Sequence, residues 1–220
     1  MAIVTKFRGV ITDWGGVLTT PILTTVQAWI EAEAIDWDSY RTVMRAWLAA
    51  AYDADGGHNP VYALERGECS GPEFERLLAA ELLRLDGGAV PAEGLLRRMF
   101  AASVPDYAMY DTIRAVRGAG LRTALLSNSW GRDDYPRADF PGLFDAVVIS
   151  GEVGMRKPEE AIFLYAAQAL GLTPRDCVFI DDVEANVNAA VACGMAGVLH
   201  TEAAATAAAL QDLLGASPIR

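Results

Sequence analysis

The sequence predicts an α/β protein in which a parallel sheet is covered by helices and an all-helical segment is inserted after the first strand. Five short apolar runs suited to buried strands recur along the 220 residues, and a helical pattern precedes each later run. Between the first and second runs, residues 21–96 contain helical patterns but no strand-like run. Because alternating strands and helices form parallel sheets, we expect the strand-free segment to be a separate insert.

The first strand is expected at residues 7–12, an apolar stretch that runs into the turn Asp13-Trp14-Gly15-Gly16. The other strands are expected at 121–126, 146–149, 177–180 and 196–199. Helical spacing followed by glycines predicts a helix over 107–116, and Pro158 is expected to open another. The alanine-rich stretch 203–214 is expected to form a closing helix.

Two amphipathic helices are expected in the insert. The first covers about 37–51, and its apolar face includes Trp37, Tyr40 and Trp47. The second follows the capping box Ser70-Gly71-Pro72-Glu73 and carries apolar residues from 74 to 85. The aromatic stripe is more typical of a core than of a substrate platform, and His58, in the loop between the helices, is more typical of an exposed turn.

Charge and cysteine content restrict the partners and the compartment. With 18 Lys and Arg against 29 Asp and Glu, the net charge is −11 at pH 7, which repels nucleic acids and anionic membrane surfaces. The three cysteines lack paired spacing, and the sequence shows no signal peptide or long apolar span. We expect a reduced, cytoplasmic protein that binds neither nucleic acid nor membrane; its oligomeric state is left open.

Polar side chains follow three of the expected strands, at the carboxyl ends where ligands of open parallel sheets bind. Each of these residues alone is also typical of a turn or a helix cap. Their ordered combination along one sheet edge favours phosphate or metal chemistry. The residues are Asp13 after the first strand, Ser127 and Asn128 after the second, Asp181 and Asp182 after the fourth, and Lys157, expected to start the helix at Pro158.

These stretches resemble the four ordered motifs of the haloacid dehalogenase superfamily, a group of aspartate-nucleophile hydrolases. The resembling stretches are 10–18, 124–129, 154–158 and 178–186, and 66–74 resembles the linker of a helical cap inserted after the first motif. The resemblance implies a Rossmann-like α/β core formed by residues 1–18 and 97–220. It also implies a helical cap domain over residues 19–96.

The resemblance implies a magnesium-dependent phosphatase centre. Asp13 would attack phosphorus and form an aspartyl-phosphate, and Mg²⁺ would be held by Asp13, the Gly15 carbonyl and Asp182. Asp182 is preferred to Asp181 because its spacing to Asn186 fits the fourth motif. Asp181 and Asn186 would support these groups without binding substrate.

Ser127 and Lys157 would contact the oxygens of the transferring group, and Asn128 would assist in binding the small anionic metabolite. Two observations favour this role for Lys157. The chain uses arginine for nearly all of its other positive charges, with Lys6 as the only other lysine. A compact ammonium also suits a single point contact better than a guanidinium does.

Gly15 departs from the usual phosphatase pattern, which has a second aspartate two residues after the nucleophile. That aspartate protonates the leaving alkoxide, a contribution of about 10²–10⁴-fold in rate. Phosphatases with glycine at this position also occur in the superfamily. Hydrolysis of a small phosphomonoester therefore remains the expected activity.

Three alternatives follow from the missing aspartate. Phosphonate hydrolases need a cap lysine, but residues 19–96 contain none. Dehalogenases of 2-haloacids need a cap arginine soon after the nucleophile, whereas the first arginine after Asp13 is Arg41, inside an expected helix. Because of this, and because Asp182 indicates a metal site, dehalogenation ranks second, behind phosphatase activity. A non-catalytic fold that binds a metabolite or a protein ranks third.

Overall fold

The described part of the chain forms a sheet of five parallel strands, in the order β3-β2-β1-β4-β5. The computed structural model describes residues 6–49, 59–131 and 135–215. The sequence order reverses on either side of β1, the position at which such sheets bind ligands. The strands are β1 (Gly9–Thr12), β2 (Arg122–Ser127), β3 (Ala146–Ile149), β4 (Cys177–Asp181) and β5 (Ala196–Leu199). The predicted α/β fold is confirmed.

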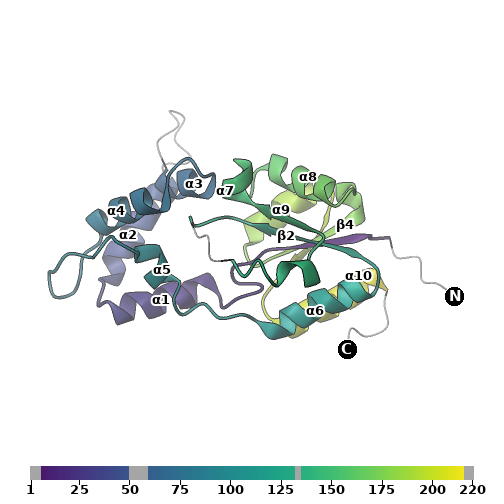
Figure 1. Cartoon of the computed structure of the whole chain (residues 1–220), viewed down its shortest axis with the longest axis horizontal. Helices are drawn as coiled ribbons and strands as arrows, with labels where there is room; N and C mark the ends of the chain where they lie inside the picture. The colour runs from purple at the N-terminus through teal and green to yellow at the C-terminus, as the bar shows by residue number, and fades with distance from the viewer. Residues whose placement is uncertain (1–5, 50–58, 132–134, 216–220) are drawn as a thin grey trace.

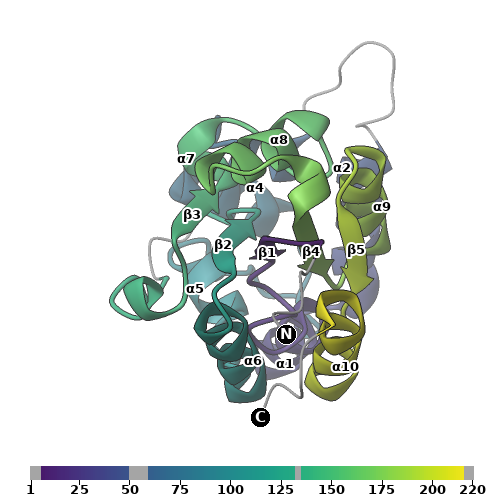
Figure 2. The ribbon, with the colours of Figure 1, turned by 90° about the vertical axis from the view of Figure 1, so that its right-hand side faces the viewer.

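Helices cover both faces of the sheet (Figure 2), which explains why the strands are continuous apolar runs rather than alternating ones. Val10 and Val178 pack on the side of α6 and α10, whereas Ile11 and Phe179 pack on the side of α8 and α9. The helices of this core are α6 (Tyr107–Gly118), α7 (Ser150–Val153), α8 (Glu160–Ala169), α9 (Glu184–Ala192) and α10 (Ala203–Leu214).

The helix expected at Pro158 begins two residues later, at Glu160. Before it, Glu159 N donates to Arg156 O over 2.9 Å, which closes a turn. The prediction that Lys157 starts a helix is wrong because this turn comes first. Lys157 therefore lies in the loop between α7 and α8.

The chain between β1 and α6 forms an all-helical insert, as predicted. Its helices pack around an apolar cluster that includes Trp29, Phe74 and Leu95. Figure 1 shows the insert at one end of the sheet and the start of β1 towards the other. The expected domain limits at 19 and 96 remain a prediction. The helices are α1 (Ile22–Ala32), α2 (Trp37–Ala49), α3 (Pro60–Glu65), α4 (Gly71–Glu81) and α5 (Leu95–Met99).

Helix α4 is shorter than its apolar pattern indicates. Its start is as predicted, because the Ser70 hydroxyl accepts a hydrogen bond from Glu73 N. It ends at Glu81, after which the chain runs antiparallel to residues 34–36, with Leu85 N donating to Ala34 O over 2.8 Å. Leu85 is 73% exposed, so the predicted continuation to residue 85 is wrong. Backbone pairing with a distant segment, rather than local spacing, ends this helix.

The aromatic stripe of α2 belongs to the insert core, as expected. Trp37, Tyr40 and Trp47 pack against the apolar cluster of the insert. His58 lies outside the described residues. Across those residues, we find no helix with the length and apolarity needed to cross a bilayer.

Candidate active site

Three carboxylates meet at the carboxyl edge of β1 and β4. Thr12 is paired with Ile180 across these strands, so Asp13 leaves the sheet beside Asp181 and Asp182. Oxygen atoms of the three carboxylates lie within 4.8 Å of one another. The register of two adjacent parallel strands thus joins residues that are far apart in sequence.

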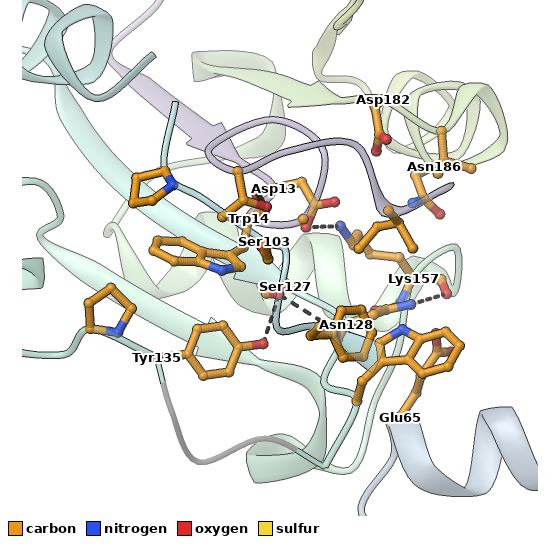
Figure 3. Close-up of a pocket in the computed structure, with 18 residues that line it drawn as sticks. Asp13, Trp14, Glu65, Ser103, Ser127, Asn128, Tyr135, Lys157, Asp182 and Asn186 are labelled. Atoms are coloured by element: carbon orange, nitrogen blue, oxygen red, sulfur yellow. Dashed lines mark hydrogen bonds and ion pairs between the residues drawn. The ribbon is translucent and has the colours of Figure 1, made fainter. Parts of the chain in front are cut away.

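Lys157 lies between Asp13 and Asp181, and Figure 3 shows its contact with Asp13. Its Nζ is 2.7 Å from Asp13 Oδ1 and 2.7 Å from Asp181 Oδ2, and its side chain is 1% exposed. Burial alone would lower the pKa of Lys157, but the two carboxylates outweigh this effect and raise it. Lys157 is therefore a permanent, fixed positive charge next to Asp13.

Asp181 and Asp182 differ in what they can reach. Asp181 is fully buried, and its oxygens accept hydrogen bonds from Lys157 Nζ, Val183 N and Asn186 Nδ2. Asp182 is only partly buried and lines a cavity at the sheet edge. Asp181, itself bound by Asn186, therefore holds Lys157 in place, whereas Asp182 lines the cavity together with Asp13.

The charges of the group are unbalanced. Three carboxylates face one ammonium, which leaves two negative charges. Burial, followed by the nearby carboxylates of Asp181 and Asp182, raises the pKa of Asp13 to about 7 despite the contact with Lys157. Hard oxygen donors with a charge deficit of two fit a divalent cation such as Mg²⁺. Asp13, Asp182 and Gly15 all line the cavity and would hold it.

Gly15 and Gly16 shape the loop after Asp13 in different ways. Gly16 has a φ of 80°, and a Cβ there would lie 2.2 Å from Asp182 Oδ2. Gly15 has no positive φ, and its Cβ would meet only the side-chain end of Ile22, at 2.8 Å from Cδ1. Only Gly16 is therefore required as glycine by the backbone and by the carboxylate beside it.

Ser127 and Asn128 follow β2 at the same edge and both line the cavity. The Ser127 hydroxyl shares a hydrogen bond of 3.0 Å with the Tyr135 hydroxyl. Asn128 Oδ1 accepts from Lys157 N over 2.9 Å, and its Nδ2 donates to Lys157 O over 3.1 Å. The amide of Asn128 thus fixes the Lys157 backbone, a positioning contact that the sequence did not indicate.

Sequence reasoning missed most of the wall of this cavity, which has a volume of about 400 Å³. Its missed aromatic members lie in loops that approach each other only in the folded chain. Trp14 and Trp130 could have been predicted as lining residues, since each directly follows a motif at the end of a strand. Phe100 and Tyr135 had no such signal. The aromatic lining residues are Trp14, Phe100, Trp130 and Tyr135.

Glu65, at the end of α3, is a charged group of the insert that the sequence analysis also missed. It lines the cavity and forms an ion pair with Arg156, whose guanidinium lies 3.6 Å from the centre of the Tyr62 ring. Burial raises the pKa of Glu65, although Arg156 and Asn128 oppose the shift. This pair joins the insert to the loop that carries Lys157.

The carboxyl edge of the parallel sheet, beneath a helical insert, carries two cavity-lining aspartates and a buried lysine, an arrangement that suits an enzyme with a carboxylate centre. A family model described as haloacid dehalogenase-like hydrolase matches residues 7–194, and the chain belongs to this family of hydrolases.

Curated relatives cover the chain at modest identity. Acyl-CoA dehydrogenase family member 10 of Mus musculus is 27% identical over 96% of this chain, and bifunctional epoxide hydrolase 2 of Sus scrofa is 25% identical over 94%. The chain spans only 19% and 38% of those two proteins. The sesquiterpene phosphatase astK of Aspergillus oryzae is 27% identical, over 69% of this chain and 77% of its own length.

Solved structures share the fold. The HAD family enzyme bt-2542 of Bacteroides thetaiotaomicron has a TM-score of 0.61 at 20% identity, covering 89% of this chain and 94% of its own. A dehalogenase also has a TM-score of 0.61, at 18% identity, covering 90% of this chain and 86% of its own. At these identities the structures support the fold alone.

Proposed function

We propose that this hydrolase cleaves small phosphomonoesters through an aspartyl-phosphate on Asp13, with Mg²⁺ bound by Asp13, the Gly15 carbonyl and Asp182. The observation that carries the proposal is the contact of Lys157 with Asp13. Asp13 belongs to a cluster of three carboxylates, and with one lysine beside it this cluster keeps a net charge of −2. A phosphomonoester is an anion, so its approach to Asp13 requires that this negative charge be neutralised.

In the proposed reaction, Asp13 is the nucleophile and Lys157 orients it. Lys157 also favours the ionised form of Asp13, so that a carboxylate oxygen attacks phosphorus while the bond from phosphorus to the ester oxygen breaks. The leaving alkoxide takes its proton from water, because Gly15 offers no acid. Water then attacks the phosphorus of the aspartyl-phosphate, which releases phosphate and restores the Asp13 carboxylate. Magnesium, when bound, would neutralise charge on the phosphoryl oxygens.

The named relatives support this reaction class. Two are called phosphatases: the sesquiterpene phosphatase above and a phosphoserine phosphatase of Thermus thermophilus, 34% identical over 51% of this chain and 48% of its own length. The bt-2542 enzyme was also solved as a complex with magnesium and inorganic phosphate, at a TM-score of 0.57. Within the part of the chain that the structure describes, the cavity wall contains no arginine, and Arg41 instead pairs with Asp38 at an exposed site. The described part of the wall therefore offers a halide no guanidinium.

The proposal is tested by measuring phosphate release from a panel of phosphomonoesters in the presence of Mg²⁺. We expect turnover by the wild type and none by Asp13→Asn, because an amide does not act as the nucleophile. Asp111→Asn, at an exposed pair on α6, is the matched control and should keep full activity. Turnover that survives in Asp13→Asn contradicts the mechanism.

A further inference from the structure

We propose that the preferred substrate has one phosphate on an apolar, uncharged body, and that the aromatic wall of the cavity selects it. This inference rests on the phosphatase function proposed above. It is drawn from the chemistry of the cavity wall, which is divided into a charged end and an apolar side.

The apolar side is built from four separate segments of the chain. Trp14 follows β1, Ile22 begins α1, Phe100 and Pro105 lie between α5 and α6, and Trp130 and Tyr135 follow β2. Figure 3 shows Trp14 and Tyr135 on the same side of Asp13 and Ser127. A body attached to the phosphate would leave the charged end and enter this apolar wall.

The wall is fixed before any ligand binds. Trp14 makes edge contacts with Tyr110, Tyr135 and Phe140, with ring centres 5.7 to 6.1 Å apart. Trp130 makes edge contacts with Phe74 and Phe100 at 6.0 and 5.8 Å. Aromatic rings held in this way offer apolar area with little loss of conformational freedom on binding.

The charged side chains in the described part of the wall leave no partner for a second anion. Lys157 is the one cation in the described part of the wall, and it is already bound to Asp13 and Asp181. Glu65, the charged lining residue that the insert contributes, is an anion that pairs with Arg156. A bisphosphate or a carboxylated body would therefore lose its hydration without gaining an ion pair.

A body with many hydroxyls is equally disfavoured. Beyond the reaction centre, the polar side chains of the described wall are Thr19, Glu65, Ser103 and the Tyr135 hydroxyl, of which Glu65 is paired with Arg156 and Tyr135 with Ser127. Each buried hydroxyl without a partner lowers affinity by roughly tenfold or more. The volume of about 400 Å³ is in the usual range for small-molecule sites.

The test compares two esters of the same shape, cyclohexylmethyl phosphate and glucose 6-phosphate, both esters of a primary alcohol. We expect kcat/KM to favour cyclohexylmethyl phosphate by roughly 100-fold or more. In the series ethyl, butyl and hexyl phosphate, each added methylene should raise kcat/KM roughly fourfold until the wall is covered. Calorimetry with Asp13→Asn should show the same preference in binding, with no turnover involved.

Variants of the wall locate the preference. Trp130→Ala should reduce the ratio of the two kcat/KM values at least tenfold, and Trp37→Ala, an aromatic change in the insert away from the cavity, should leave it unchanged. Ile22→Thr, which shortens a partly exposed side chain and adds a hydroxyl to the wall, should shift the ratio in the same direction if Trp130→Ala does not fold.

The outcomes separate this inference from the proposed function. If many phosphomonoesters are hydrolysed but glucose 6-phosphate matches or exceeds cyclohexylmethyl phosphate, the substrate inference is overturned and the phosphatase function stands. If no phosphomonoester is hydrolysed by folded protein that binds Mg²⁺, both are overturned. An unchanged ratio in Trp130→Ala and Ile22→Thr would also overturn the assignment to this wall.

Discussion

Gly15 occupies the position at which the expected phosphatase pattern has a second aspartate, and the structure shows that the backbone there does not demand glycine. Its φ is not positive, and a new Cβ would press only on the flexible end of Ile22. A carboxylate can therefore be added at this position without rebuilding the loop.

Gly15→Asp should raise turnover of alkyl phosphates, up to about 10²-fold, because it supplies a proton to a poor leaving group. Aryl phosphates should change little, since aryloxide leaves without a proton. Folding and Mg²⁺ binding are verified first, and rates are then compared for both ester types. If alkyl phosphates gain nothing in folded, magnesium-binding protein, the missing-acid hypothesis is wrong.

Gly16→Ala should weaken Mg²⁺ binding as strongly as Asp182→Ala does. The added Cβ would lie 2.2 Å from Asp182 Oδ2, at a residue with a positive φ, so the loop or the carboxylate must move. Calorimetry gives the affinities of wild type and both variants. An unchanged affinity in Asp182→Ala would contradict the proposed ligand set, and an unchanged affinity in Gly16→Ala would contradict the steric argument.

At the scale of secondary structure elements, α3 is joined to the loop before α8 by the buried pair of Glu65 and Arg156. The Ser150 hydroxyl adds a second link, since it donates to Glu65 O and accepts from Ser129 N. The insert is thus connected directly to loops that carry the reaction centre.

Glu65→Gln should lower the free energy of unfolding by about 3 kcal/mol, because it leaves the buried Arg156 guanidinium without a counter-charge. Denaturation in urea measures this change. Asp111→Asn, which breaks the exposed pair with Arg114, should cost less than about 1 kcal/mol. Equal losses in the two variants would show that burial does not strengthen the pair of Glu65 and Arg156.

A second element contact is sensitive to pH. His200 follows β5, is buried, and shares a hydrogen bond of 2.8 Å with Thr206 of α10; burial lowers its pKa, against a weaker opposing effect of Asp106. Because the pKa of His200 is lower in the folded chain than in the unfolded chain, the neutral imidazole stabilises the fold above about pH 6.5. This contribution to the free energy of unfolding is lost as the pH falls.

Between pH 7.5 and 5.5, the wild type should therefore lose more unfolding free energy than His200→Gln, in which this group does not titrate. Urea denaturation at both pH values measures the two losses. Equal losses would mean that protonation of His200 is not coupled to folding.

At the scale of the whole molecule, the sheet and its polar edge could be predicted because both depend on local sequence. A strand that ends in a charged residue places that residue at the carboxyl edge, as with Asp13 and Asp182. The end of α4 and the start of α8 depended on backbone contacts that local spacing does not encode. The aromatic lining was only partly predictable: Trp14 and Trp130 follow strand-end motifs, whereas only the folded chain brings Phe100 and Tyr135 to the cavity.

The central claim, that Asp13 is a nucleophile toward phosphorus in a magnesium-dependent site, can be tested without knowing the substrate. Trifluoroberyllate binds a nucleophilic carboxylate as a mimic of aspartyl-phosphate, and fluorine NMR detects the bound form. We predict protein-bound fluorine resonances that require Mg²⁺ and are absent in Asp13→Asn. Bound resonances that persist in Asp13→Asn, or none in wild-type protein shown to bind Mg²⁺, would contradict the account.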